Sequence, residues 1–475
     1  MNFRSSLGAL VVCALISSQA SAQSTPETAV LKGLAPVSVL LNTDGGKAAL
    51  GANYTVTGGI QTGAIPQPTL LPFPEQQQQA LRDAFITGNN LAQLADGLGT
   101  TLGSAYVARF HHIDQKQTSK LPQSIGDLIS YATAVSGAHS NAGKYLFANE
   151  TTDGKTPVSP DEVAMLKELG GVEDIFGKAY NLAAGTVGAD AYGNSRPYQT
   201  EPSVTQIVGP DYLNTPAGNY VYNHGPMMDL TNSPSYPSGH TTYGYTGAVL
   251  LAVLVPERYA QMITRGAEYG NDRVIMGSHY VMDVLGGRTL ALYDMAHLLA
   301  NDPTYMGLSV RGAPPIKDFQ RAVKNARSEL IAVLQAGCGN TIEACAVEDT
   351  GRFNNPAADE AFYDATQTYS LPVVYPKNAG VLEDVEKLAP KAGYLLTQAF
   401  SSLSLEQADK ILTETEGPGG GFLDNGSEFG VYSRLNIYAA ARRAEKIVAG
   451  AKTAHAGLST RTNIRALRAR SVGER

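Results

Sequence analysis

Three short segments of the sequence carry arginine, serine, histidine and aspartate residues at spacings that suit chemistry on an oxyanion. They are Arg196-Pro197, Pro237-Ser238-Gly239-His240 and the spaced motif Arg273-x5-His279-x3-Asp283. Two arginines can clamp the oxygens of a tetrahedral anion, because guanidinium groups bind such oxygens bidentately. A histidine beside a carboxylate can act as a nucleophile, and a second histidine can supply a proton. Together these residue types indicate phosphoryl transfer through a histidine, without a metal.

The second segment is predicted to begin a buried helix, because apolar residues dominate 241–255. Ser238 is a suitable N-cap, and Gly239 lets a ligand approach the backbone closely. The free N–H groups and the positive dipole end of such a helix bind anions. His240 would then lie beside the anion and could pass a proton to it. The alternative is an ordinary helix start with a surface histidine.

His279 and Asp283 are four residues apart, so we expect both on one face of a helix. The carboxylate would accept a hydrogen bond from one imidazole nitrogen and leave the other nitrogen as a nucleophile. A zinc-ligand pair and a structural His–Asp hydrogen bond are the alternatives. No third zinc ligand stands at a recognisable spacing. Taken alone, Arg196 or Arg273 would more often form a surface salt bridge.

These segments resemble, in order and in separation, the type 2 phosphatidic acid phosphatase (PAP2) superfamily. That superfamily includes bacterial non-specific acid phosphatases and vanadium-dependent haloperoxidases, and its pattern is Lys-x6-Arg-Pro, Pro-Ser-Gly-His and Ser-Arg-x5-His-x3-Asp. The resemblance implies an all-α fold with a helical bundle core. It implies that His279 is the nucleophile that forms a phosphohistidine, that Asp283 orients it, and that His240 protonates the leaving alcohol. The phosphate would be held by four further residues, Arg196, Arg273, Ser238 and the backbone of Gly239.

Two positions depart from the family pattern. The family lysine would fall at Ala189, beside Asp190, and the family serine before the third-motif arginine is replaced by Asp272. Loss of the lysine removes a positive phosphate contact, which Asp190 cannot replace. Lys178 is the nearest upstream lysine, but nothing in the sequence places it at the site. We therefore expect either a lower substrate affinity or another cation in that corner.

The rest of the chain is expected to position or flank this site. Apolar residues recur at helical steps from Pro74 onward, capping boxes begin at Ser159 and Ser404, and stretches with strand periodicity are scarce. Arg4, a short apolar run and Ala20-Ser21-Ala22 are typical of a signal peptide, which predicts a periplasmic or secreted protein. The expected segments are a signal peptide at 1–22, an irregular N-terminal arm at 23–74, a PAP2-like helical catalytic core at 75–300, a C-terminal helical extension packed on the core at 301–451, and a flexible basic tail at 452–475.

Composition excludes several classes of protein. The chain has 475 residues, of which 43% are hydrophobic and 17% charged, so it can bury a sizeable core and is not disordered throughout. Its formal net charge of −7 provides no general basic field for nucleic acid. No apolar stretch after the signal peptide is long enough to span a membrane. Cys338 and Cys345 are predicted to form a local disulfide, because their spacing suits neither a zinc site nor a redox pair.

The leading hypothesis is an exported, metal-independent phosphatase that acts on small phosphomonoesters and needs no cofactor. A vanadate-dependent haloperoxidase is the first alternative, disfavoured because the family lysine is missing; only that alternative would require vanadate. A non-catalytic oxyanion-binding protein is the second, disfavoured because pure binding needs neither a nucleophile nor an acid. Of the remaining histidines, His111 and His112 fit an exposed polar turn better than a metal site, and His224 could line the substrate entrance.

Overall fold

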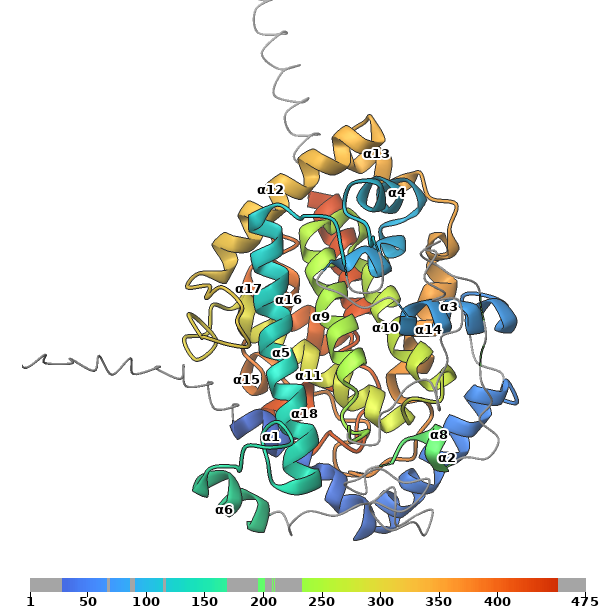
Figure 1. The fold of residues 1–475 in the computed structure, drawn as a ribbon, viewed down its shortest axis with the longest axis vertical. Helices are drawn as coiled ribbons and strands as arrows, with labels where there is room; N and C mark the ends of the chain where they lie inside the picture. Colours follow the sequence, from blue (N-terminus) through green and yellow to red (C-terminus); the bar gives the residue numbers. More distant parts are fainter. Residues whose placement is uncertain are drawn as a thin grey trace, which may run out of the picture.

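The computed structural model of the chain is built from helices, which Figure 1 shows packed around α9, α10 and α11. It describes residues 28–65, 69–85, 90–113, 117–168, 195–200, 207, 209 and 233–451. Within these ranges there is no strand, only two isolated β-bridges, so the predicted all-α class is confirmed. The elements are α1 (Thr28–Leu34), η1 (Ala35–Leu41), α2 (Asp44–Thr62), α3 (Phe73–Phe85), η2 (Leu91–Leu98), α4 (Thr100–Arg109), α5 (Gln123–Asn149), α6 (Pro160–Glu168), α8 (Pro197–Thr200), α9 (Gly239–Leu254), η3 (Pro256–Arg258), α10 (Tyr259–Ile275), α11 (Val281–Leu299), α12 (Phe319–Cys338), α13 (Ile342–Val347), η4 (Arg352–Asn354), α14 (Pro356–Thr368), α15 (Val385–Leu388), α16 (Tyr394–Thr397), α17 (Leu405–Glu414) and α18 (Glu428–Tyr432).

Helix α9 lies at the centre of the core and is buried on nearly all sides, as its apolar sequence predicts. It packs against α10, α11 and the long helix α5, which runs beside α9 in Figure 1. The first residues of α9 and α11 meet, because Ser238 N donates a hydrogen bond of 2.9 Å to Asp283 O. Gly287 permits this approach, since a β-carbon there would lie 2.5 Å from Ser238 O. The start of α9, the end of α10 and the start of α11 therefore lie together.

The expectation of an irregular N-terminal arm is wrong for Thr28–Thr62, which forms α1, η1 and α2. Thr43 caps α2, accepting a hydrogen bond of 2.9 Å from Gly46 N. The buried positions of α2 recur at helical steps, but several of them are glycine, asparagine or threonine. Because these residues are polar or lack a side chain, the helical period does not stand out in the sequence. Helix α2 packs against α10 and α11.

Residues 301–451 pack against the helices that precede them. Helix α12 contacts α4 and α5, and Tyr259 Oη of α10 donates a hydrogen bond of 2.7 Å to Leu395 O of α16. The predicted disulfide is confirmed: Cys338 at the end of α12 is bonded to Cys345 in α13. Both predicted capping boxes form, with the side chains of Ser159 and Ser404 accepting from the backbone N–H three residues later. The last described helix occupies 437–451.

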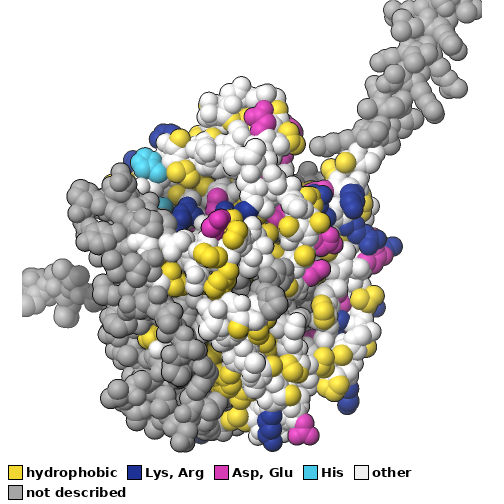
Figure 2. Space-filling model, turned by 90° about the vertical axis from the view of Figure 1, so that its right-hand side faces the viewer, with side chains coloured by type: hydrophobic (Ala, Val, Ile, Leu, Met, Phe, Trp, Pro, Cys, Tyr) yellow, Lys and Arg dark blue, Asp and Glu magenta, His cyan; other side chains and the backbone are white. Residues whose placement is uncertain are grey.

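Several sequence predictions lie outside the described residues: the signal peptide, the basic tail, Ala189 with Asp190, Lys178 and His224. Among the described helices, none combines the length and the apolar character needed to cross a membrane. On the face shown in Figure 2, the basic and acidic side chains that the structure describes are interspersed and do not form separate fields of one sign.

Candidate active site

The three predicted segments meet at the end of the bundle where α9 and α11 begin. Arg196 Nη1 donates hydrogen bonds to His279 Nε2 at 3.0 Å and to Ser278 O at 2.9 Å. Tyr198 N donates to Gly277 O at 3.0 Å, which fastens the Arg196 segment to the turn that precedes His279. The hydrogen bond from Ser238 N to the backbone of α11 brings the segment Pro237-Ser238-Gly239-His240 to the other two. Residues far apart in the sequence thus form one cluster of buried polar groups.

The contact between His279 and Asp283 forms, but not in the way that their spacing suggests. His279 lies in the turn after α10, so the expectation that both residues share a helix face is wrong. Asp283 is the third residue of α11, and its carboxylate accepts a capping-box hydrogen bond of 2.9 Å from Tyr280 N. The same Oδ2 atom lies 3.2 Å from His279 Nδ1 and accepts a hydrogen bond from Ser235 Oγ. The start of the helix therefore fixes the carboxylate that orients the imidazole.

The two nitrogens of His279 are in different environments, which selects one tautomer. Asp283 Oδ2 accepts from Nδ1, so the proton resides there, and Nε2 keeps its lone pair toward Arg196 Nη1. Complete burial lowers the pKa of His279 well below its usual value, and the charges of Arg196, Lys144 and Arg273 lower it further. The imidazole is therefore neutral, with Nε2 available as a nucleophile.

Asp283 also has a shifted pKa. Burial raises it to about 6, although hydrogen bonds from Ser235 and Tyr280 and the charges of Arg196 and Lys144 act in the opposite direction. Its second oxygen, Oδ1, is buried and has no hydrogen-bond partner within the described part of the chain. Above pH 6 the carboxylate is charged and can stabilise an imidazole that becomes positive when it bonds to phosphorus.

The two arginines differ in how many of their donors are engaged. Arg196 is held by the loop before α9: its Nε donates to Ser233 O at 3.1 Å and its Nη2 to Ser233 Oγ at 3.1 Å. Arg273, at the end of α10, is fully buried, and its Nη2 donates to Ser278 Oγ at 3.3 Å. Among the residues that the structure describes, its Nε and Nη1 have no hydrogen-bond partner. Unpaired buried donors on a permanent cation are suited to an anionic ligand.

The start of α9 is built as its sequence predicts. Ser238 is the N-cap, and its Oγ accepts from Thr241 N at 3.2 Å and from Thr241 Oγ1 at 2.9 Å. His240 follows in the first turn, half-buried, and lines a cavity of roughly 390 Å³ between α5 and α9. Partial burial lowers the pKa of His240 well below its usual value, as do the charges of Arg273, Lys144 and Arg196. This histidine is thus placed between the cationic cluster and an open cavity.

Lys144 is the residue of this cluster that sequence reasoning missed. It lies on α5 and lines the same cavity as Gly239 and His240. Its charge acts on His240 and His279, as the lowered pKa values of both histidines indicate. No motif marked it, because it precedes the motif-bearing part of the chain and reaches the site only through the packing of α5 on α9.

Asn53 and Thr57 of α2 are two further residues that the sequence did not single out. Thr57 Oγ1 accepts a hydrogen bond of 3.1 Å from Val281 N, and Asn53 Oδ1 accepts one of 3.0 Å from Met282 N. These N–H groups belong to the first turn of α11 and have no acceptor within the helix. Helix α2 therefore anchors the turn that carries Asp283.

Asp272, the second departure from the family pattern, belongs to a different cluster. Its Oδ1 accepts a hydrogen bond of 2.9 Å from Gln76 Nε2 of α3. Burial and the nearby carboxylates of Asp83 and Glu268 raise its pKa well above the usual range. Arg265 is paired with Asp83 and Glu268 in the same cluster, between α3 and α10. Asp272, which stands in place of the family serine, thus contributes to the contact between α10 and α3.

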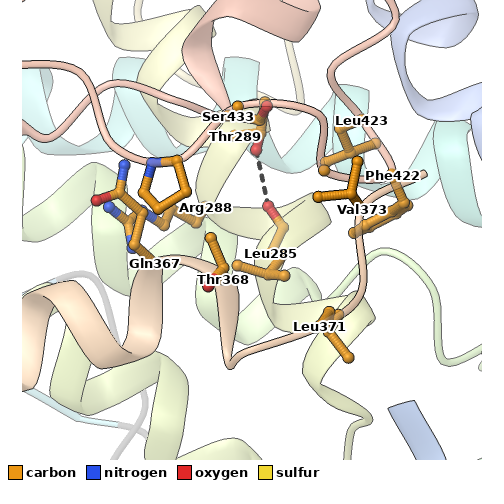
Figure 3. A pocket seen from close by; sticks show the side chains of 13 residues that line it. Leu285, Arg288, Thr289, Gln367, Thr368, Leu371, Val373, Phe422, Leu423 and Ser433 are labelled. Atoms are coloured by element: carbon orange, nitrogen blue, oxygen red, sulfur yellow. Dashed lines mark hydrogen bonds between the residues drawn. The ribbon is translucent and has the colours of Figure 1, made fainter. Parts of the chain in front are cut away.

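Two further features of the described residues, His112 and a second cavity, do not extend this cluster. His112 lies 3.1 Å from Gln93 Oε1, and burial lowers its pKa to about 4. No group of three or more metal-ligating side chains occurs in the part of the chain that the structure describes. Figure 3 shows a cavity between α11 and the C-terminal loops, lined mainly by apolar side chains such as Leu285, Leu371 and Phe422. It contains none of the motif residues.

Comparison with known proteins agrees with this geometry. The model of the PAP2 superfamily matches residues 176–300, which include Arg196 and α9, α10 and α11. This segment belongs to the PAP2 superfamily. Curated relatives include an acid phosphatase of Zymomonas mobilis, 35% identical over 101 residues, and non-specific acid phosphatases of Salmonella typhimurium, 36% identical over 101 residues, and Providencia stuartii, 40% identical over 72 residues.

The similarity is confined to part of each protein. The three matches cover 21%, 21% and 15% of this chain and 33%, 34% and 29% of the respective relatives. The chain thus spans about a third of the length of these curated acid phosphatases. Lys144, Asn53 and Thr57 lie outside the PAP2 segment.

Proposed function

We propose that the protein is an exported phosphatase that hydrolyses small phosphomonoesters through a phosphohistidine at His279. The observation that carries the proposal is the setting of His279, whose Nδ1–H is turned to Asp283 and whose Nε2 lone pair faces Arg196. Similarity to acid phosphatases over the PAP2 segment supports the same chemistry. The signal-peptide pattern at the N-terminus supports export.

In the first step, His279 Nε2 attacks phosphorus in line with the ester bond. Arg196 Nη1 transfers its hydrogen bond from Nε2 to a phosphate oxygen, and the unpaired donors of Arg273 bind others. The P–N bond forms as the P–O bond to the alcohol breaks, and His240 gives its proton to the leaving oxygen. Asp283 balances the positive charge on the substituted imidazole.

In the second step, water attacks the phosphohistidine. His240, now neutral, accepts a proton from the water as its oxygen bonds to phosphorus. The P–N bond breaks, inorganic phosphate leaves, and His279 returns to its neutral form. The proton taken from water leaves His240 protonated for the next cycle, and the negative charge of the bound ester favours this form by offsetting the cations that lower its pKa.

The test is turnover of p-nitrophenyl phosphate by the purified full chain and by His279→Ala, with His111→Ala as control. His111 is exposed and lies outside the site. We expect His279→Ala to lose essentially all activity and His111→Ala to retain it. Brief reaction with labelled ester followed by alkaline quenching should trap label on the full chain and none on His279→Ala. Full activity in His279→Ala would overturn the proposal.

A further inference from the structure

A buried lysine from outside the PAP2 segment faces the start of α9. Only 7% of Lys144 is exposed. A β-carbon on Gly239 would stand 3.6 Å from Lys144 Nζ and 3.5 Å from Ser140 Oγ, which lies one helical turn earlier on α5. Resting on the proposed function, we propose that Lys144 and Ser140 bind the substrate phosphate and that Lys144 replaces the family lysine lost at Ala189.

The packing of α5 brings these two side chains to the site. Residues 140 and 144 are four apart on α5, so they share one face of that helix. On the same side of α5, Gly143 lets the helix approach α1, since a β-carbon there would lie 2.6 Å from Leu34 Cδ1, and Pro237 of the loop before α9 lies at ordinary contact distance, 3.5 Å from that β-carbon. The hydroxyl and the ammonium are therefore held against the backbone N-terminus of α9, where an anion binds.

Both side chains have unused hydrogen-bonding capacity. Within the described residues, Lys144 forms no hydrogen bond and no ion pair, and Ser140 Oγ is buried without a partner. A buried ammonium without an anionic partner destabilises the fold, because its charge has lost its hydration. Burial and the charge of Arg196 lower the pKa of Lys144 to about 7, while Asp283 acts in the opposite direction. An anionic ligand would compensate this lysine.

The cationic groups around Lys144 define what that ligand must be. Arg196, Arg273 and Lys144 all act on the pKa of His279 and of His240, so the three cations lie near both imidazoles, and Arg311 lines the same cavity as Lys144. The cluster also contains the carboxylate of Asp283, whose Oδ2 is engaged by Ser235, Tyr280 and His279. A dianionic phosphate monoester matches this arrangement, with Lys144 contacting it from the α5 side.

The test measures phosphate affinity directly, because binding requires no turnover. Titration calorimetry of the full chain with inorganic phosphate is compared for the unmodified protein, Lys144→Met, Lys144→Arg and Ser140→Ala. Lys155→Met is the matched control, since Lys155 is exposed in the loop after α5. We expect Lys144→Met to raise the Kd by about ten- to a hundredfold, the loss of one charge-assisted hydrogen bond. Lys144→Arg should restore most of the affinity, and Ser140→Ala should have a smaller effect.

The outcomes separate this inference from the proposed function. Unchanged phosphate affinity in Lys144→Met overturns the inference, even if the protein is a phosphatase. An equal loss in Lys155→Met also overturns it, because the effect would then reflect net charge alone. Phosphate binding that depends on Lys144, in a protein without turnover, supports the inference and overturns the proposed function. Unfolding temperatures of all variants show whether a change in affinity comes from loss of the fold.

Discussion

Asp283 Oδ2 lies 3.2 Å from His279 Nδ1, although only Asp283 belongs to α11. The capping box with Tyr280 fixes the carboxylate, and the turn after α10 brings the imidazole to it. The orientation of the nucleophile therefore depends on the first turn of one helix and on the residues that anchor this turn.

Asp283→Asn should keep the fold and lose most of the activity. The amide can donate to Nδ1 of His279, which would place the proton on Nε2, the atom that must attack. We expect kcat for p-nitrophenyl phosphate to fall by about 10²- to 10⁴-fold. The matched control is Asp302→Asn, which alters another His–Asp pair, with His297 Nδ1 at 2.8 Å, outside the site. An Asp283→Asn enzyme with normal kcat would contradict the role of this carboxylate.

His240→Ala should discriminate between leaving groups. Nitrophenolate leaves without protonation, whereas an alkoxide needs the proton that His240 supplies. The loss of kcat should therefore be at least about tenfold larger for an alkyl phosphate than for p-nitrophenyl phosphate. His111→Ala should leave both substrates unaffected. Equal losses for the two esters would show that His240 does not protonate the leaving group.

Thr57→Val on α2 should lower both the stability of the protein and its kcat, although Thr57 is not one of the motif residues. The isosteric valine removes the acceptor of Val281 N and leaves a buried N–H at the start of α11 unpaired. We expect a loss of about 1–2 kcal/mol in the free energy of unfolding, together with a lower kcat. Thr55→Val is the control, because Thr55 is exposed on the same helix. Unfolding in urea, monitored by circular dichroism, measures the first effect, and a stability equal to that of the unmodified protein would refute it.

The motifs in the sequence predicted that their residues form one site, but they did not show which structural elements bring these residues together. Arg196, His240, His279 and Asp283 converge because short motifs preserve the types and spacings that one site needs. The helix face expected for His279 was wrong, since a spacing of four residues fits a helix and a capping box equally well.

The contributions of α2 and α5 could not be read from the sequence for a different reason. Lys144 and Thr57 reach the site through tertiary packing between helices, and no local pattern records which faces will meet. Helix α2 itself was not predicted, because its buried face includes Asn53 and Thr57. These polar residues accept hydrogen bonds from the backbone at the start of α11. Polar residues that bind the backbone of a neighbouring helix weaken the hydrophobic periodicity from which a helix is recognised in a sequence.

Lys144→Met should stabilise the protein under acidic conditions. The pKa of Lys144 is lowered to about 7, so between pH 7 and 10.5 the unfolded chain binds more protons than the folded one, and stability rises with pH. Below pH 7 the full cost of the buried charge is present, although Asp283 lessens it. Removing the ammonium should raise the unfolding temperature by about 2 °C or more at pH 6, and by less near pH 10. Lys155→Met should give no such trend. A lower unfolding temperature for Lys144→Met at pH 6 would contradict this account.

Vanadate should inhibit phosphatase turnover competitively and more tightly than phosphate does. Vanadate readily becomes five-coordinate, which resembles the geometry of phosphorus during in-line attack by His279. An enzyme that stabilises this state binds such an analogue more tightly than a ground-state ligand, so we expect its Ki to lie at least about 10²-fold below that of phosphate. Inhibition constants are measured with p-nitrophenyl phosphate as substrate. Equal inhibition by vanadate and phosphate would mean that the site does not favour five-coordinate geometry.

The same vanadate-loaded protein tests the haloperoxidase alternative, with bromide and peroxide as substrates. Ala189 predicts weak bromide oxidation, whereas Lys144 places a cation beside the same site and could polarise bound peroxide. The balance is therefore measured on one preparation, as the ratio of phosphomonoester hydrolysis without vanadate to bromide oxidation with it. We expect hydrolysis to dominate, because His240 and the cavity between α5 and α9 suit a leaving alcohol. Strong bromide oxidation with negligible hydrolysis would instead identify the oxyanion site as that of a vanadate enzyme.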